Sequence, residues 1–330
     1  MQLDKMESIS HSSDSSQFFA VIIANPTSGI GGFPLQTHRF DETLAYLRNQ
    51  GWKVELWYTQ SAGDGEQLAR KAVKQQVNLV IAAGGDGTIN EIIQGLAGSE
   101  TALGVLPNGT INVWARELGI PLDDTRARRV LVNGQTRHID LGCVNGRYFL
   151  LMVGIGFDGE VTQAVERKPL KRLGILGYAL AVLWLGPGYR GFPVVAQIDG
   201  YVLKSRAMQI FIGNTQLYAG AFKFTWQAKC DDGLLDLCIV LKRNLWGRLV
   251  IARDLILRRE KRRLWVRYDT FKTLKIETPQ PIPYQIDGEA GGYTPAELSV
   301  APGVLKVIVP QKTPEGLFSK EVDSAKDANI

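Results

Sequence analysis

The chain has 330 residues, of which 45% are hydrophobic, and its formal net charge is +5. This length and this apolar content suffice for roughly two domains with separate cores and argue against a disordered chain. The longest apolar run, residues 173–185, is shorter than the roughly 20 residues of a membrane-spanning helix. The three cysteines and three histidines lack metal-ligand spacing, which argues against a zinc site or a Ser/His/Asp array.

The first half of the chain alternates expected strands with expected helices. Residues 1–17 are Ser-rich and lack the apolar segment of a signal peptide, so we expect a disordered leader there. Over residues 18–135 the pattern predicts strands at 18–24, 52–58, 78–83 and 102–106, and helices at 40–49, 63–75 and 88–97. This alternation favours an α/β fold, a doubly wound and mostly parallel sheet that binds a nucleotide.

Near residue 136 the pattern changes to paired strands joined by tight turns. Asn145-Gly146 and Asp199-Gly200 are strong hairpin signals. The expected strands are 139–144, 148–153, 194–198, 201–212, 234–241, 264–268, 274–277 and 304–309, and the expected helices are 170–185 and 246–262. The sequence therefore predicts an antiparallel β-sandwich domain over residues 136–310 and a loose polar tail over 311–330.

A glycine-rich segment after the third expected strand predicts a phosphate site. Gly84, Gly85 and Gly87 leave no Cβ between the backbone and a ligand. Thr88 can cap the following helix, whose free N–H groups favour an anion. Asp86 would repel a triphosphate unless a divalent cation lies between them, so it suggests Mg²⁺. The alternative is a turn that only joins strand to helix.

Two more polar loops and one threonine follow the other expected strands. The first loop begins at Asn25-Pro26, Thr59 follows the second strand, and Pro107-Asn108-Gly109-Thr110 follows the fourth. In an open parallel sheet, ligands bind at the carboxyl ends of the strands. The sequence therefore predicts that these segments converge on one nucleotide site.

A late segment carries two acids on either side of a glycine, Asp287-Gly288-Glu289. Phosphoryl transfer to an alcohol needs a carboxylate that orients the hydroxyl and accepts its proton. Both acids could face one cleft, or a Gly-centred turn could splay them. An ordinary hairpin turn is an equally good interpretation, since Asp-Gly is a favoured turn dipeptide.

Two other charged segments have open interpretations. Asp231-Asp232 could coordinate a hard cation, although a turn is the preferred interpretation from the residues alone. Residues 242–267 hold ten Lys/Arg against two acids, which suits an anionic membrane surface or a solvated basic helix. No RNA- or DNA-binding signature accompanies them, so we expect no nucleic-acid partner.

Five segments in this order resemble the diacylglycerol-kinase catalytic-domain family, and more narrowly its bacterial soluble lipid kinases. The segments are residues 25–29, 84–91, 107–112, 231–236 and 285–289. The resemblance covers the chain from about Phe18 to Pro310. The first loop departs mildly from the family at Ile30-Gly31-Gly32, which leaves the contacts just after Gly29 open.

The resemblance implies a first domain like that of NAD kinase and phosphofructokinase, with ATP bound between the two domains. The implied nucleotide contacts are Asn25, Pro26, Thr27, Ser28, Gly29, Thr59, Gly84, Gly85, Asp86, Gly87, Thr88, Ile89, Asn90, Glu91, Asn108, Gly109 and Thr110. It further implies that Asp86 lies in the catalytic centre near Mg²⁺, and that Glu289 accepts the proton with Asp287 supporting or sharing the role. The implied structural cation is held by Asp232 and the backbone carbonyls of Lys229 and Leu234.

The predicted function is an ATP- and Mg²⁺-dependent lipid kinase that phosphorylates diacylglycerol or a related lipid. We expect a cytoplasmic protein that contacts its lipid substrate peripherally at a membrane surface and that could form a homodimer. Lys168 to Arg172 and the following apolar stretch suit such a contact, although core packing explains them as well. The alternatives are an NAD kinase or sugar-phosphate kinase, and a non-catalytic nucleotide or lipid sensor. The prediction requires Asp287 and Glu289 to lie close to Asp86.

Overall fold

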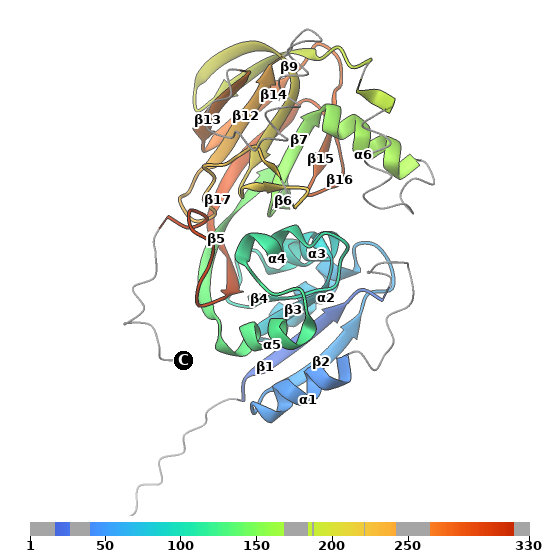
Figure 1. Cartoon of the computed structure of the whole chain (residues 1–330), viewed down its shortest axis with the longest axis vertical. Helices are drawn as coiled ribbons and strands as arrows, with labels where there is room; N and C mark the ends of the chain where they lie inside the picture. The colour runs from blue at the N-terminus through green and yellow to red at the C-terminus, as the bar shows by residue number, and fades with distance from the viewer. Residues whose placement is uncertain are drawn as a thin grey trace, which may run out of the picture.

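The computed structural model describes residues 17–26, 40–167, 184–186, 188–220, 222–241 and 265–319. Within them, the chain forms a lower α/β domain and an upper β domain (Figure 1). The predicted helix at 246–262 lies outside the described residues, as does the predicted helix at 170–185 apart from residues 184 and 185.

The first domain is built on a parallel sheet with strand order β2-β1-β3-β4. Its strands are β1 (Phe19–Ala24), β2 (Lys53–Tyr58), β3 (Leu79–Gly84) and β4 (Ala102–Pro107). Every residue of β3 and β4 is buried, as expected of strands covered on both faces. The predicted doubly wound sheet is confirmed.

Helices cover this sheet in two layers (Figure 1). They are α1 (Asp41–Asn49), α2 (Asp64–Lys74), α3 (Asp86–Leu96) and α5 (Asp124–Asn133). The chain moves outward from β1 to β2 and then back across β1 to β3 and β4. Right-handed crossovers in opposite directions place α1 on the face opposite α2 and α3. Accordingly α1 contacts α5, and α2 contacts α3.

The helix after the glycine-rich segment begins earlier than predicted. It starts at Asp86 rather than at Thr88, and the extended Gly85 is its N-cap. No side chain caps this helix, so the predicted capping role of Thr88 is wrong. Thr88 lies in the first turn instead, where its hydroxyl accepts a hydrogen bond from the Asn25 side chain at 3.4 Å.

The second domain consists of antiparallel strands, as predicted. They are β5 (Gln135–Val144), β6 (Arg147–Phe149), β7 (Met152–Gly156), β8 (Phe192–Ile198), β9 (Tyr201–Gly213), β10 (Leu217–Tyr218), β11 (Phe222–Lys223), β12 (Leu235–Leu241), β13 (Val266–Phe271), β14 (Thr273–Glu277), β15 (Pro283–Ile286), β16 (Glu289–Tyr293) and β17 (Ala296–Val309). Asn145-Gly146 joins β5 to β6 and Asp199-Gly200 joins β8 to β9, which confirms both predicted hairpins. Three helices were not predicted: α4 (Val113–Leu118), α5 and α6 (Phe157–Arg167).

One predicted strand is divided. The sequence predicts a continuous strand over 148–153, whereas the structure breaks it at Leu150 and Leu151 into β6 and β7. The backbone N–H groups of Leu150, Leu151 and Met152 donate to the carboxylate of Asp287. The break therefore marks the place where a side chain from a distant turn replaces strand pairing.

The last strand is longer than predicted and connects the two domains. β17 begins at Ala296 rather than near residue 304, and it pairs with β14 and β5 in the β domain. At its far end Val307 pairs in parallel with Leu103 of β4. The core of the first domain accordingly includes Leu305 and Val307.

The segment after β17 is packed rather than loose, contrary to the prediction for residues 312–319. Leu317 is buried, and its carbonyl oxygen accepts the backbone N–H of Cys230 at 3.0 Å. The backbone N–H of Ser319 donates to Asp231. Within the described part of the chain, no helix is long and apolar enough to cross a membrane.

Candidate active site

Two glycine loops meet backbone to backbone at the carboxyl ends of β3 and β4. A Cβ placed on Gly109 would lie 2.4 Å from the Cα atom of Gly85, so only glycine permits this approach. The backbone N–H of Asn108 donates to the Gly84 carbonyl at 3.0 Å. The side chain of Asn112 closes its loop by accepting from the Gly109 N–H at 2.7 Å and donating to the Gly109 carbonyl at 2.8 Å.

The ends of β1 and β2 join these loops. The backbone N–H of Thr59 donates to the Ala24 carbonyl at 3.0 Å, and that of Asn25 donates to Ala83 at 3.2 Å. The structure therefore brings the predicted strand-end segments together, Thr110 lying exposed in the last of them. Thr27, Ser28 and Gly29 lie outside the described residues, whereas Pro26 is described.

Two residues of the glycine-rich segment make contacts within the first domain, and their predicted contact with a nucleotide stays a prediction. Ile89 is buried in the core of the first domain. The Glu91 carboxylate accepts the backbone N–H groups of Gly63 and Gly65, both at 2.9 Å. Glu91 therefore holds the N-terminus of α2 in place.

Asp86 has a partner that the sequence reasoning did not consider. Its two carboxylate oxygens accept the backbone N–H groups of Val113 at 2.9 Å and Trp114 at 3.1 Å, at the start of α4. Burial raises the pKa of Asp86, and these two N–H groups oppose that rise. The contact with α4 explains why an acid stands in the glycine loop without invoking a cation. The role of Asp86 at Mg²⁺ stays a prediction.

Asp287 joins the β domain to α3. One of its oxygens accepts the N–H groups of Leu151 and Met152, both at 2.9 Å, and the other accepts Leu150 N–H and the Asn90 side-chain amide, both at 2.8 Å. Burial raises the pKa of Asp287, and these four donors oppose the rise. A carboxylate with four donors suits a role in holding structure better than the acceptance of a substrate proton.

A tight turn separates Asp287 from Glu289. Asp287 and Gly288 have φ angles of 48° and 91°, which a two-residue hairpin turn requires. The Gln285 side chain accepts the Gly288 N–H at 2.6 Å and steadies this turn. The Asp-Gly pair is thus a hairpin turn, and it directs the two acids into different surroundings at the same end of α3.

Glu289 lies over the first turn of α3. A Cβ placed on Gly87 would lie 2.7 Å from its Oε1 atom, so the absence of a side chain at Gly87 admits the carboxylate. Its Oε2 atom lies 3.5 Å from Nη2 of Arg147, and its side chain is 46% exposed. Glu289 is therefore an accessible carboxylate held against the helix that follows the glycine loop. It lies against Gly87, the residue after Asp86, whereas the proximity of both acids to the Asp86 carboxylate stays a prediction.

A second carboxylate joins the domains at α4. Glu117 is buried and accepts the backbone N–H of Leu217, just before the turn that leads to β11. Burial raises the pKa of Glu117, whereas the N–H groups of Leu217 and Gln216 and the charge of Lys223 lower it. In Figure 1, α3 and α4 lie side by side on the part of the first domain that faces the β domain.

Sequence reasoning missed Arg147 and Glu117 and left Asn112 out of the site. Arg147 follows the Asn145-Gly146 turn directly, and a charged residue next to a predicted turn gives no sign of its distant partner. Glu117 lies in an unpredicted helix of six residues. Asn112 has a φ of 54°, and an asparagine next to a glycine loop is a usable signal for such a conformation.

Three acids gather around the segment at 229–234. The two oxygens of Asp140 accept the N–H groups of Gly233 at 2.6 Å and Gly303 at 2.7 Å. Asp232 accepts the Leu234 N–H at 3.1 Å, and burial together with the nearby charges of Asp140 and Asp231 raises its pKa. The described residues contain no cluster of three His, Cys, Asp or Glu side chains that could hold a metal. The predicted site at Lys229, Asp232 and Leu234 relies on backbone carbonyls, and it stays a prediction.

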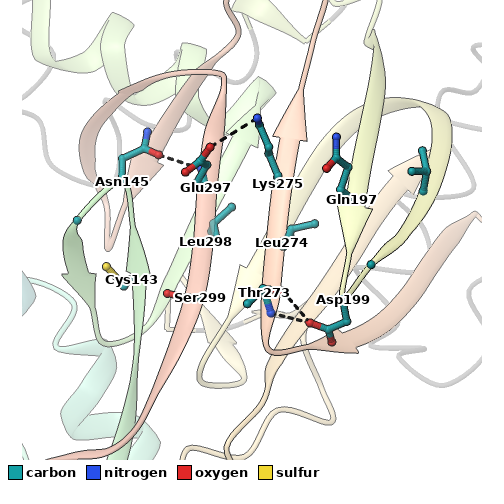
Figure 2. Close-up of a pocket in the computed structure, with 13 residues that line it drawn as sticks. Cys143, Asn145, Gln197, Asp199, Thr273, Leu274, Lys275, Glu297, Leu298 and Ser299 are labelled. Atoms are coloured by element: carbon teal, nitrogen blue, oxygen red, sulfur yellow. Dashed lines mark hydrogen bonds and ion pairs between the residues drawn. The ribbon is translucent and has the colours of Figure 1, made fainter.

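A hollow of about 570 Å³ lies elsewhere, on the β domain across β5, β17, β14 and β8. Figure 2 shows that its charged side chains already have partners: Lys275 with Glu297 at 3.6 Å, and Asp199 with the Thr273 N–H at 2.8 Å. None of the predicted site residues lines this hollow. The candidate site is therefore the junction of α3 with the β15–β16 turn.

Comparison with known proteins agrees with this geometry. Residues 19–144 match the diacylglycerol kinase catalytic domain, and residues 151–309 match the YegS C-terminal NAD kinase beta sandwich-like domain. A diacylglycerol kinase of Bacillus subtilis (strain 168) is 33% identical over 301 residues, 90% of this chain and 98% of the relative. One from Staphylococcus aureus (strain MRSA252) is 34% identical over 283 residues, 84% of this chain and 88% of the relative.

A solved structure gives the same fold. It is a crystal structure of a diacylglycerol kinase candidate from Bacillus anthracis (strain Sterne), with a TM-score of 0.76 and 26% identity, covering 89% of this chain and 98% of that one. The chain therefore belongs to the diacylglycerol kinase family, a family of lipid kinases that transfer a phosphoryl group to an alcohol.

Proposed function

We propose that the protein is an ATP- and Mg²⁺-dependent lipid kinase that transfers the γ-phosphate to the hydroxyl of diacylglycerol or a closely related lipid. The single observation that carries the proposal is the position of Glu289. A half-exposed carboxylate from the β domain lies against Gly87, in the first turn of the helix that follows the glycine loop.

The glycine loops are the proposed phosphate site. Gly84, Gly85 and Gly109 keep the backbone free of side chains where β3 and β4 end. The first N–H groups of α3 have no partners within the helix and face the same region, which favours an anion. Asn25 and Thr59 come from the neighbouring strand ends and would contact the nucleotide beside these loops.

Glu289 is the proposed proton acceptor, and Asp287 is its support. The lipid hydroxyl would give its proton to Glu289 while its oxygen forms a bond to the γ-phosphorus and the bond to the β-phosphate oxygen breaks. Asp287 already accepts four hydrogen bonds, which fix the turn that carries Glu289. We therefore assign the proton to Glu289 alone.

Mg²⁺ would offset the charge that develops on the phosphate oxygens. Asp86 would face it with the lone pairs that remain beside its contacts to Val113 and Trp114. A second, structural cation would suit Asp232, because burial and, after it, the neighbouring carboxylates raise its pKa, and a cation would relieve the repulsion between the carboxylates. Carboxylate and carbonyl oxygens at Lys229, Asp232 and Leu234 are suitable ligands for a hard cation.

The lipid would reach Glu289 along β16 and α6. β16 begins at Glu289 and ends at Tyr293, which is 46% exposed and donates to Gln163 of α6 at 3.1 Å. Beyond α6, the Trp184 side chain is 66% exposed, and such a side chain suits the interface of a membrane. A hollow of about 480 Å³ near α6 offers room for part of an acyl chain, and its lining is Glu160, Trp184, Leu185, Gly188, Tyr189, Arg190, Gly191, Phe192 and Ile282.

The test is phosphoryl transfer from labelled ATP with Mg²⁺ to a panel of acceptors in mixed micelles. The lipids are diacylglycerol, monoacylglycerol, ceramide, sphingosine and phosphatidylglycerol, and NAD and fructose 6-phosphate form separate arms. We expect label in the diacylglycerol arm and none with NAD or the sugar phosphate. Label in either of the latter would replace the proposal with a related kinase, and tight ATP binding without any transfer would indicate a sensor. Light scattering on the purified protein without micelles tests the predicted homodimer.

A further inference from the structure

Arg147 lies between the two domains at the candidate site. It is the first residue of β6, directly after the Asn145-Gly146 turn. Its Nη2 atom donates to Oδ1 of Asn90 at 2.7 Å and lies 3.5 Å from Oε2 of Glu289. One guanidinium therefore reaches α3 of the first domain and the carboxylate that we propose as proton acceptor.

The contact with Asn90 fixes where the guanidinium lies. Asn90 is buried, and its Nδ2 donates to the Asp287 carboxylate at 2.8 Å while its Oδ1 accepts from Arg147. A carboxylate only accepts and a guanidinium only donates, so the two partners together determine the orientation of the Asn90 amide. Arg147 is thus tied to the helix that begins at the glycine loop.

The exposure of Glu289 leaves its side chain room for more than one orientation. Nearly half of its side chain is exposed, and the glycine at Gly87 gives room without giving a hydrogen bond. A glutamate side chain with this freedom has several rotamers open to it. The attraction of Arg147 for Oε2 directs the other oxygen, Oε1, toward Gly87.

We propose that Arg147 is a positioning residue: by bridging Asn90 and Glu289, it holds the Glu289 carboxylate over the first turn of α3 in the orientation that accepts the lipid proton. The proposal rests on the proposed function. An ion pair as exposed as Arg147–Glu289 adds little to stability, so its contribution lies in geometry. The Nη2 atom of the planar guanidinium lies between both acceptors, a geometry that the flexible ammonium of lysine reproduces only in part.

The experiment compares five variants with the wild type: Arg147→Ala, Arg147→Lys, Glu289→Gln, the double variant Arg147→Ala/Glu289→Gln, and the control Arg128→Ala. Arg128 of α5 pairs with Glu42 of α1 at 3.4 Å, away from the site. The measurements are kcat, KM for ATP and for diacylglycerol, Tm, and crystal structures of the wild type and Arg147→Ala.

We expect Arg147→Ala to lower kcat about 10- to 100-fold, since small displacements of a reacting group have effects of this size. KM for ATP should change less than about threefold and Tm should stay near that of the wild type. Arg147→Lys should recover part of kcat, and Arg128→Ala should keep all of it. The double variant should be no slower than Glu289→Gln, and Glu289 should leave Gly87 in the Arg147→Ala crystal structure.

Three results would overturn the proposal. The first is that Arg147→Ala lowers kcat of Glu289→Gln by the same factor as it lowers kcat of the wild type. The second is that Arg147→Ala raises KM for ATP and leaves kcat unchanged. The third is that Glu289 has not moved in the crystal structure of Arg147→Ala. If the wild type transfers phosphate to no lipid, the proposed function fails, and the crystal structures alone then decide whether Arg147 positions Glu289.

Discussion

Two of the contacts between the domains have the same chemistry, a buried carboxylate that accepts N–H groups from the other domain. At α3, Asp287 of the β domain accepts the Asn90 amide of the first domain. At α4, Glu117 of the first domain accepts a backbone N–H of the β domain, at Leu217. Each domain thus gives one carboxylate to the other, and burial raises the pKa of both.

The contacts differ in what lies beside the structural carboxylate. Next to Asp287 a two-residue turn places Glu289, half-exposed, against Gly87. The neighbours of Glu117 are the N–H groups of Leu217 and Gln216, the side chain of Thr215 and the charge of Lys223. The comparison teaches that a buried carboxylate whose oxygens already accept several N–H groups holds the two domains together. Proton transfer requires a second, accessible carboxylate beside it.

The sharpest test of this difference is Glu289→Gln. The amide keeps the size of the side chain and cannot accept a proton, so we expect kcat for lipid phosphorylation to fall about 1000-fold, within the range for loss of a general base. The free energy of unfolding should hardly change. Glu277→Gln, which alters a half-exposed glutamate paired with Lys275, is the matched control and should keep full activity. Activity above about a tenth of the wild type would remove Glu289 from the proposed role.

Asp287→Asn should damage the fold as well as activity. Asparagine tolerates the left-handed backbone of this turn, but its NH₂ group would face two of the four donors that the carboxylate now accepts. Leaving buried donors without acceptors costs about 1–3 kcal/mol each, so we expect the free energy of unfolding to fall by about 3 kcal/mol. Urea unfolding followed by circular dichroism measures it. A variant as stable as the wild type with normal Tm would contradict the structural role.

The contact at α3 was partly predictable, because the loops and the turn that form it can each be recognised from the local sequence. Parallel strands end at one edge, so the loops after β1, β3 and β4 could be brought together from strand order alone. The Asp287-Gly288 turn is encoded by its dipeptide. Its partner Arg147 lies far away in the sequence, and only tertiary folding brings the two turns to the same helix.

Other features were missed for identifiable physical reasons. Asp86 has its acceptor role because a helix of six residues starts at Val113, and so short a helix has no detectable period. β17 was predicted too short, and its sequence is interrupted by Pro302-Gly303, a dipeptide typical of turns. The structure places an irregularity in strand pairing there, with the Gly303 N–H bound to Asp140 at 2.7 Å.

A smaller effect is expected from Gly87→Ala. Alanine suits the interior of a helix better than glycine by roughly 0.5–1 kcal/mol, so the fold should not suffer. The new Cβ would lie 2.7 Å from Oε1 of Glu289, and the flexible end of that side chain must move away. We expect kcat to fall about 10-fold with the free energy of unfolding unchanged or slightly raised. If KM for ATP rises and kcat stays the same, Gly87 is needed only for binding the phosphates of ATP, and its contact with Glu289 does not contribute to catalysis.

The smallest effect should come from the α4 contact, through Glu117→Gln and its dependence on pH. Burial raises the pKa of Glu117 above its ordinary value of 4.5, so the folded protein keeps this proton to higher pH than the unfolded chain does. The free energy of unfolding of the wild type therefore contains a term that falls as pH rises from about 4.5 through the raised pKa. Glutamine has no such term. At pH 5 we expect Glu117→Gln to be less stable than the wild type by about 1 kcal/mol, the scale of one hydrogen bond. At pH 8 this gap in the free energy of unfolding should be smaller. The kcat of the variant should equal that of the wild type at both pH values. Urea unfolding at the two pH values measures the gap, and a gap that widens toward pH 8 would mean that the ionised carboxylate stabilises this contact.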